Sequence, residues 1–268
     1  MVGRPAMATG FVVAALSATL IAVPAFADSG LDYVALGDSY SSGVGAPGAT
    51  TACLQSPLGY PALFADAADV TSFTQVACGG AKTADVLAGQ LDALSPQTDV
   101  VSLTIGGNDV GFAPTLGTCL FGDDTQCAQV VEATGTNELV TVGANLDRTY
   151  AAIRERAPDA KVIVLGYPRL FEETPDCGFG GLSLAKRQVL NAGADRLAEQ
   201  VAARVGAAGP AFTYVDVRGA FVGHGICGAD PWLNNASLLA LVDSFHPNAE
   251  GYAQGYLPTL SAVVDAVT

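Results

Sequence analysis

The stretch LDYVALGDSYSSG at residues 31–43 decides the fold, because an apolar run leads directly into a tight Gly-Asp-Ser turn. The run predicts a β-strand with Ser39 at its carboxyl end. Open α/β sheets bind their ligands outside the carboxyl ends of the strands. The segment DSFHPN follows about two hundred residues later, and its His246 is one of only two histidines in the chain. A serine at a strand end and a scarce histidine indicate a hydrolase.

Short β-rich runs alternate with longer helical patterns through the rest of the chain. Segments 137–157, 182–205 and 249–267 repeat Ala, Leu and Val at three- and four-residue spacing, which predicts helices. Alternation of this kind is typical of βαβ units and a parallel sheet. We therefore predict an α/β fold, a three-layer α/β/α sandwich with a parallel five-stranded sheet in flavodoxin-like order. The expected strands are 33–36, 71–76, 100–105, 161–165 and 213–217.

Three long connections, at 112–136, 168–181 and 220–243, each follow an expected strand and each contain cysteine. They are interpreted as loops at the same sheet edge as Ser39, where they would build a substrate pocket. They contain more apolar side chains than a surface loop needs, which favours a pocket for an acyl chain. These side chains are Phe112, Leu116, Leu120, Phe121, Leu170, Phe171 and Phe179.

The first 27 residues have the pattern of a secretory signal. Arg4 precedes an apolar run at 11–23, and Ala-Phe-Ala at 25–27 fits a signal-peptide cleavage site. The run is shorter than the roughly 20 residues that a membrane span needs, so no stable membrane insertion is expected. We expect a secreted, extracellular protein in which residues 28–268 form a single domain.

The charge of the expected mature chain excludes nucleic acid as a partner. Removing the signal takes one of the 12 basic residues and none of the 26 acidic ones, so the net charge is 11 − 26 = −15. Binding to phosphates depends on Lys and Arg that displace counterions. A surface this acidic repels both nucleic acid and anionic lipid head groups.

Six cysteines, an even number in an exported chain, predict disulfides. Fifteen pairings are possible, and the spacing favours neighbours in the sequence. A zinc site would need close Cys-x-x-Cys or Cys/His clusters, which this chain lacks. Each neighbouring pair would hold one of the predicted loops. The favoured pairs are Cys53 with Cys78, Cys119 with Cys127, and Cys177 with Cys227.

Three further motifs follow the Gly-Asp-Ser turn: CGGA at 78–81, GGND at 106–109 and DSFHPN at 243–248. Together the four blocks, in this order, resemble the SGNH (GDSL) hydrolase family, whose name lists its serine, glycine, asparagine and histidine. The resemblance covers nearly the whole chain after the signal. With its three cysteine pairs the chain is similar to the secreted actinobacterial lipases and esterases of that family.

The resemblance implies a catalytic serine, histidine and acid. Ser39 matches the nucleophile, and His246 matches the base that activates its hydroxyl. Asp243, three residues earlier, matches the acid that fixes the imidazole tautomer. Some relatives use a backbone carbonyl in place of this carboxylate, and Asp230 is a nearby substitute.

The resemblance also implies an oxyanion hole with three N–H donors. These are the backbone N–H groups of Ser39 and Gly80 and the side-chain amide of Asn108. Gly79 is the neighbouring candidate if the register differs by one residue.

Other features are given structural interpretations. The stretch GVGAPG at 43–48 fits a dinucleotide-binding pattern, but Pro47 removes an N–H and no helix is expected to follow it. His224 is interpreted as a loop residue, so we expect no metal site and no cofactor. Asp38 and Asp109 are interpreted as acceptors that hold the turns of the site, a role that ordinary Asx turns share.

The expected function is hydrolysis of carboxylic esters of lipids, such as acylglycerols, through an acyl-enzyme on Ser39, by a monomer. The same site would also suit a phospholipase A or a carbohydrate-ester deacetylase. From another class, the chain would be a secreted binding module without catalysis. The presence of Ser39, Gly80, Asn108 and His246 together argues against this last alternative.

Overall fold

The computed structural model describes residues 1–3, 30–68, 70–177, 182–237 and 239–267. Its centre is a parallel sheet of five strands in the order β2-β1-β3-β4-β5, with every neighbouring pair parallel. This is the flavodoxin-like order predicted from the sequence, so that prediction is confirmed. The strands are β1 (Leu31–Gly37), β2 (Val70–Gln75), β3 (Val100–Thr104), β4 (Lys161–Leu165) and β5 (Phe212–Val215).

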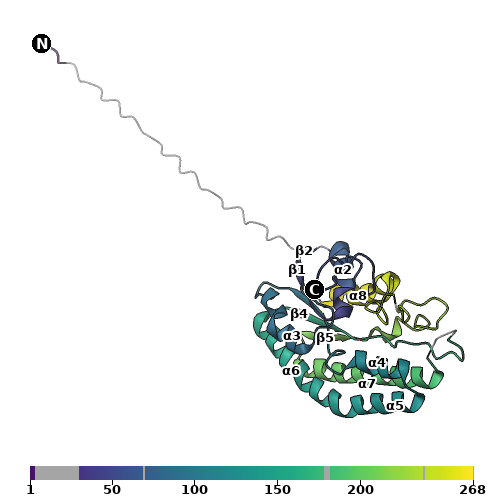
Figure 1. Ribbon diagram of the computed structural model, residues 1–268. Coiled ribbons are helices and arrows are strands. Elements are labelled where there is room, and N and C mark those ends of the chain that lie inside the picture. The colour runs from purple at the N-terminus through teal and green to yellow at the C-terminus, as the bar shows by residue number, and fades with distance from the viewer. Residues whose placement is uncertain (4–29, 69, 178–181, 238, 268) are drawn as a thin grey trace.

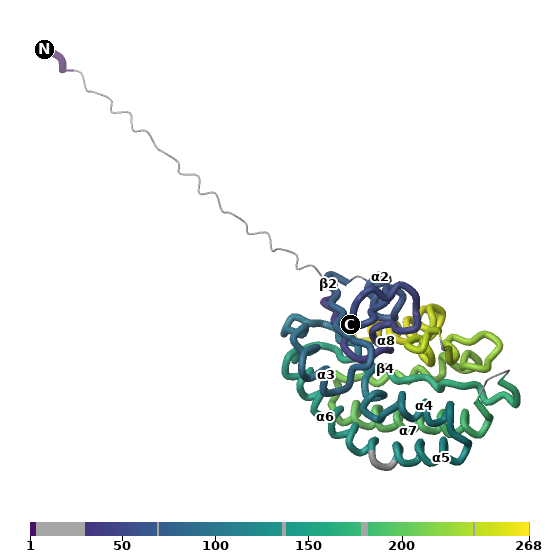
Figure 2. Tube along the Cα trace, viewed as in Figure 1, coloured from purple at the N-terminus to yellow at the C-terminus, as the bar shows by residue number. Residues whose placement is uncertain are grey.

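Helices cover both faces of the sheet and complete three layers (Figures 1 and 2). Alternate strand residues point to opposite faces, so Tyr33 packs into one apolar core and Val34 into the other. On one face lie α2 (Tyr60–Ala67) and α8 (Leu257–Val267). The other face is covered by three helices, α3 (Thr83–Ala88), α6 (Leu139–Arg156) and α7 (Leu184–Ala208).

The segment 112–136, predicted as a loop, contains two helices, so that prediction is wrong. They are α4 (Phe112–Phe121) and α5 (Asp124–Ala133), and a π-helical turn (Thr134–Glu138) leads on into α6. Pro114 lies in the first turn of α4, where its missing N–H costs no hydrogen bond. Asp123 and Gln126 form a capping box that starts α5. Each helix is too short to show a clear period in the sequence.

The short elements that remain lie at strand ends and turns. They are α1 (Ser39–Ser42) after β1, and two 3-10 helices at Gln90–Ala93 and Val217–Gly219. A π-helical segment (Gly251–Tyr256) precedes α8. Pro258 cannot donate to a backbone carbonyl one turn earlier, which accounts for a wider turn there.

Three disulfides join the cysteine pairs that the sequence favoured, and these pairings are confirmed. Cys53–Cys78 fixes the segment after β2, Cys119–Cys127 joins α4 to α5, and Cys177–Cys227 joins two loops beyond β4 and β5. The Cys119–Cys127 bridge therefore links two helices rather than holding a loop.

Two expectations fall on residues outside the described ranges, namely most of the 1–27 signal and Phe179 in the predicted pocket. Within the described ranges, no helix is both long and apolar enough to cross a bilayer.

Candidate active site

Ser39 lies at the start of α1, immediately after β1, and lines a cavity at the carboxyl edge of the sheet. The backbone N–H of Asp38 donates to the Thr104 carbonyl at 2.9 Å, which holds the turn against β3. Gly37 has a φ of +120°, and a Cβ there would overlap the Thr104 carbonyl oxygen, so only glycine fits. The carboxylate of Asp38 accepts from the Tyr40 N–H at 3.0 Å and caps α1.

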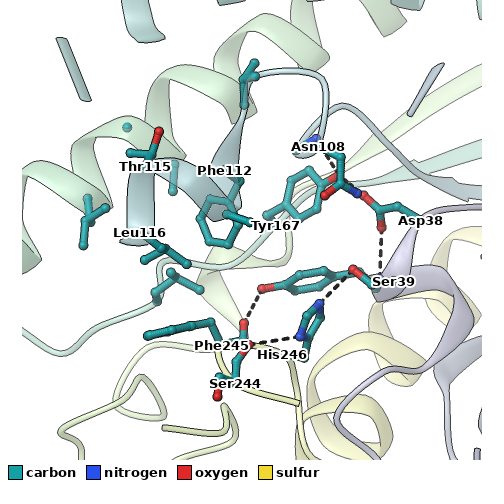
Figure 3. Close-up of a pocket in the computed structure, with 18 of the residues that line it drawn as sticks. Asp38, Ser39, Asn108, Phe112, Thr115, Leu116, Tyr167, Ser244, Phe245 and His246 are labelled. Atoms are coloured by element: carbon teal, nitrogen blue, oxygen red, sulfur yellow. Dashed lines mark hydrogen bonds between the residues drawn. The ribbon is translucent and has the colours of Figure 1, made fainter. Parts of the chain in front are cut away.

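His246 reaches the same place from the other end of the chain (Figure 3). Its Nε2 lies 2.8 Å from the Ser39 Oγ, a hydrogen bond between residues 207 positions apart. Burial of the ring lowers the pKa of His246 to about 4, while the nearby Ser244 carbonyl and Asp243 carboxylate act in the opposite direction. At neutral pH the imidazole is therefore uncharged and able to accept a proton.

The turn before His246 aims the ring at Ser39. Phe245 has a φ of +65°, in the left-handed region that a bulky side chain rarely adopts. Its carbonyl accepts a hydrogen bond of 2.7 Å from the Tyr40 hydroxyl. Tyr40, which follows Ser39, thus fixes Phe245, which precedes His246. Such backbone strain costs on the order of 1–3 kcal/mol and is typical of functional sites.

The other ring nitrogen of His246 contacts a backbone carbonyl. Nδ1 lies 3.1 Å from the Ser244 oxygen, and within the described ranges no hydrogen bond joins Asp243 to the ring. This is the backbone alternative that the sequence left open, and the role of Asp243 as the acid stays a prediction. Asp230, the other substitute, has a carboxylate oxygen 3.5 Å from His224, whose ring stacks on Trp232 at 3.6 Å.

The expected oxyanion donors line the same cavity. Gly79 donates its N–H to the Cys53 carbonyl at 3.0 Å, whereas the described chain shows no partner for the Gly80 N–H. Gly80 is therefore the better candidate of the two. Asn108 donates one amide hydrogen to the Ala81 carbonyl at 3.0 Å, which fixes the side chain and leaves its second hydrogen for a ligand.

A buried network that the sequence analysis missed connects the turn after β1 with the turn after β3. The Tyr167 hydroxyl donates to the Asp38 carboxylate at 2.5 Å and accepts from the Gly107 N–H at 2.9 Å. Burial raises the pKa of Asp38 to about 7, an effect that the bonds from Tyr167 and Tyr40 reduce and the charge of Asp109 increases. Tyr167 follows β4, but its position at a strand end does not by itself indicate the contact with Asp38.

The second acidic residue near the site, Asp109, is also a hydrogen-bond acceptor. Its carboxylate accepts from the N–H and from the hydroxyl of Thr83, the first residue of α3. The GGND turn is thereby held against a helix that begins two residues after the CGGA motif.

A deep apolar cavity of about 490 Å³ extends from Ser39 and His246 between α4, α5 and α7. Figure 3 shows Phe112, Thr115 and Leu116 of α4 on the far side of it from Ser39. Of the predicted acyl-pocket residues, Phe121 is instead exposed, and Phe171 is buried in the core away from the cavity. Aliphatic and phenylalanine side chains that line the cavity include Val110, Phe112, Leu116, Leu120, Val131, Leu139, Leu170, Leu190, Leu197, Leu241, Val242 and Phe245.

The glycines of the 43–48 stretch serve close packing. Gly43, with a φ of +91°, caps α1 and lies against Gly59. A Cβ on Gly45 would lie 2.5 Å from the Pro247 oxygen and 2.8 Å from the His246 Cβ. In the described ranges no three His, Cys, Asp or Glu side chains are arranged to hold a metal ion.

Comparison with known proteins identifies the family. Residues 35–254 match the GDSL-like lipase/acylhydrolase family. Lipase 1 of Streptomyces coelicolor is 42% identical over 258 residues, which cover 95% of this chain and 94% of that protein. The crystal structure of phospholipase A1 from Streptomyces albidoflavus superposes with a TM-score of 0.83 at 42% identity, over 86% of this chain and 98% of that one. An extracellular lipase from Streptomyces rimosus superposes with a TM-score of 0.82 at 44% identity, over 87% and 99%. The chain belongs to the GDSL-like lipase/acylhydrolase family.

Proposed function

We propose that this protein hydrolyses carboxylic esters of lipids through an acyl-enzyme on Ser39. The observation that carries the proposal is the 2.8 Å hydrogen bond between Ser39 and a neutral His246, both of which line a 490 Å³ apolar cavity. A nucleophile paired with a base is the arrangement that acyl transfer requires. The family to which the chain belongs is described as one of lipases and acylhydrolases, which is consistent with ester hydrolysis.

In the acylation step, His246 Nε2 takes the proton of Ser39 as Oγ attacks the ester carbonyl carbon. The carbonyl oxygen becomes an oxyanion, which the N–H groups of Ser39 and Gly80 and the amide of Asn108 stabilise. As this intermediate collapses, the carbon–oxygen bond to the alcohol breaks. His246 returns its proton to the departing alcohol oxygen, and the acyl group remains on Ser39.

In the second step, water repeats the attack on the acyl-enzyme. His246 takes a proton from water and then gives it to Ser39 Oγ, which releases the carboxylic acid. The Ser244 carbonyl at Nδ1 fixes the tautomer and accepts the hydrogen bond of the imidazolium that forms in both steps. That carbonyl does part of the work of a triad carboxylate, and the negative charge of Asp243 adds to it.

The lining of the cavity favours an acyl chain. Its side chains are mostly aliphatic or aromatic and come from helices α4, α5, α6 and α7 and from the segments that follow the strands. The relatives are named lipase and phospholipase A1, so acylglycerols and the acyl groups of phospholipids are the two substrate classes proposed. A carbohydrate ester fits less well, because Trp232, the single tryptophan, stacks on His224 and does not line the cavity.

Labelling of Ser39 tests the mechanism. A fluorophosphonate should attach to Ser39 in one-to-one ratio, and Ser39→Ala should abolish both labelling and hydrolysis. Asn108→Ala should keep the labelling site and lower kcat by about 10²- to 10³-fold with KM little changed, as the loss of one oxyanion donor does. Attachment at another residue would refute the acyl-enzyme on Ser39.

A substrate panel tests the class of ester. We expect p-nitrophenyl esters of longer acids, and a phospholipid, to be hydrolysed with higher kcat/KM than p-nitrophenyl acetate or acetylated xylan. Highest activity on acetylated xylan would replace the lipid proposal with a carbohydrate esterase.

We also propose that residues 1–27 are removed on export and that 28–268 form one extracellular catalytic domain. The three disulfides support an oxidising location. Amino-terminal sequencing of the protein from culture medium should begin at Asp28, and retention of the first 27 residues would contradict this.

A further inference from the structure

The described residues 235–237 and 239–243, which we call the leucine loop, expose aliphatic side chains on the protein surface. Leu239 is fully exposed, and Leu241 and Val242 are 67% and 57% exposed. Single exposed aliphatic residues are ordinary, but three within four positions form a patch that calls for an explanation.

Hydrogen bonds within the leucine loop hold it in a defined shape. The Ser244 hydroxyl accepts from the Ser237 N–H at 3.0 Å and donates to the Ala240 carbonyl at 3.1 Å. The Ser237 side chain accepts from the Leu239 N–H at 3.3 Å, and the Asp243 N–H donates to Ala240 at 3.2 Å. The exposed side chains are therefore presented by a turn that hydrogen bonds among its described residues hold closed.

The leucine loop adjoins the opening of the catalytic cavity. Leu241 and Val242 are exposed on one side and line the cavity on the other, together with Ser244 and His246. Figure 3 shows the chain from Ser244 through Phe245 to His246 at that edge. Whatever covers the exposed side of the loop is therefore placed next to Ser39.

The charges around the leucine loop restrict its partner. After Arg218 the chain contains no Lys or Arg, while Asp230, Asp243 and Glu250 are acidic. Binding to anionic lipid depends on basic residues near the surface. An apolar patch whose own stretch of sequence contains no Lys or Arg suits a surface whose head groups carry no net charge.

We infer that the leucine loop docks the protein onto the surface of a neutral or zwitterionic lipid aggregate, with Leu239 entering the acyl region. This inference rests on the proposed lipid substrate and adds how that substrate is reached. A docked loop would place the cavity opening against the lipid, so that an ester enters without crossing water. Burial of one leucine strengthens such binding by about 10-fold or more.

Flotation with vesicles that contain no carboxylic ester tests docking apart from catalysis. Vesicles of diether phosphatidylcholine meet this requirement, because this lipid contains no carboxylic ester for the protein to hydrolyse. Leu239→Asp should weaken binding to them by about 10-fold or more and lower the rate on a tributyrin emulsion. Its kcat/KM on dissolved p-nitrophenyl butyrate should be unchanged, since Leu239 does not line the cavity. Val140→Asp is the matched control, because Val140 is also exposed and belongs to α6, away from the leucine loop in Figure 1.

A gain-of-signal variant keeps the test independent of any loss of folding. Leu239→Trp should bind the same vesicles more tightly, and its tryptophan emission should shift to shorter wavelength on their addition. Trp232 is mostly buried, so the unsubstituted protein reports the background.

Three outcomes would overturn the inference. One is equal vesicle binding by Leu239→Asp and the unsubstituted protein, and another is binding only when anionic phosphatidylglycerol is included. The third is a dimer in sedimentation that Leu239→Asp dissociates without weakening vesicle binding, which would make the leucine loop a contact between copies. If the unsubstituted protein bound the vesicles but hydrolysed no ester, the proposed function would be refuted, while the docking surface would still be supported.

Discussion

At the scale of single residues, the burial of His246 sets the expected pH dependence of the reaction. The active form has a neutral imidazole, and the pKa of His246 is lowered to about 4. We expect kcat/KM on a dissolved ester to stay level down to about pH 5 and to fall as pH drops through about 4. Stopped assays over pH 3–8 would measure this, and an inflection near 6.5 would show that solvent reaches the ring.

The same pH profile distinguishes the two ways in which Asp243 can act. The charge of Asp243 raises the pKa of His246, without a hydrogen bond to the ring in the described chain. Asp243→Asn should therefore move the inflection to lower pH and cost much less in kcat than the roughly 10⁴-fold that loss of a triad carboxylate can cost. A loss near that figure would instead establish Asp243 as the acid.

Gly45 determines how closely the two ends of the site approach each other. In Gly45→Ala the new methyl group would overlap Pro247 and the His246 side chain, so His246 would be pushed away from Ser39. We expect kcat to fall at least 10-fold, because displacement of about 1 Å at a catalytic group can cost 10²-fold. Gly48→Ala is the control. Gly48 has a φ of +88°, close to the +94° of Gly45, but a Cβ on Gly48 would contact only the Pro57 side chain. Equal losses in both variants would attribute the effect to backbone strain.

Part of the site was predictable from a serine at a strand end and a scarce histidine, and the family resemblance added Gly80 and Asn108. All four residues, Ser39, Gly80, Asn108 and His246, line one cavity at the carboxyl edge of the sheet. Tyr167 was missed because its function depends on a contact with Asp38, 129 positions away, which no local pattern reports. The sequence also left the partner of His246 Nδ1 undecided. Every residue has a backbone carbonyl, so no residue type marks the Ser244 carbonyl as that partner.

At the scale of secondary-structure elements, the position of α7 beside the cavity predicts control of acyl-chain length. Ala194 lines the cavity, whereas Ala192 of the same helix is exposed. Ala194→Leu should fill part of the cavity and shift the preferred p-nitrophenyl ester to a shorter acid, with hydrolysis of the acetate unchanged. Ala192→Leu should leave the profile as it is. An unaltered profile in Ala194→Leu would place the acyl chain elsewhere.

The elements show where local sequence patterns are informative. The long helices α6 and α7 repeat a period often enough to be recognised, and the five strands are recognisable as short β-rich runs between helical patterns. Helices α4 and α5 contain ten residues each and pack through the buried Cys119–Cys127 bridge, and α4 includes glycine, proline and threonine. Their stability comes from tertiary packing, which outweighs local propensity in short helices.

At the scale of the whole molecule, the disulfides are expected to divide between stability and catalysis. Cys177–Cys227 closes a loop of 50 residues, so its removal by paired alanine substitutions should cost about 4 kcal/mol in free energy of unfolding in the entropic description. Cys53–Cys78 closes 25 residues and adjoins Gly79 and Gly80. Its removal should cost about 3.5 kcal/mol and also lower kcat, because the Gly80 N–H loses its support.

Urea unfolding and kcat at low temperature would separate these two effects. The expected result is a lower kcat only in the variant that lacks Cys53–Cys78. A lower kcat in both variants would mean that the loops beyond β4 and β5 also position reacting groups.

The 207 positions between Ser39 and His246 also have a consequence for how the protein is made. A ribosome makes the serine block about two hundred residues before the histidine that activates it, and that histidine must then fold back against Gly45. Until that happens, the growing chain has a serine with no base and cannot hydrolyse an ester. The order of synthesis thus delays catalysis until the histidine has been made and has folded into place.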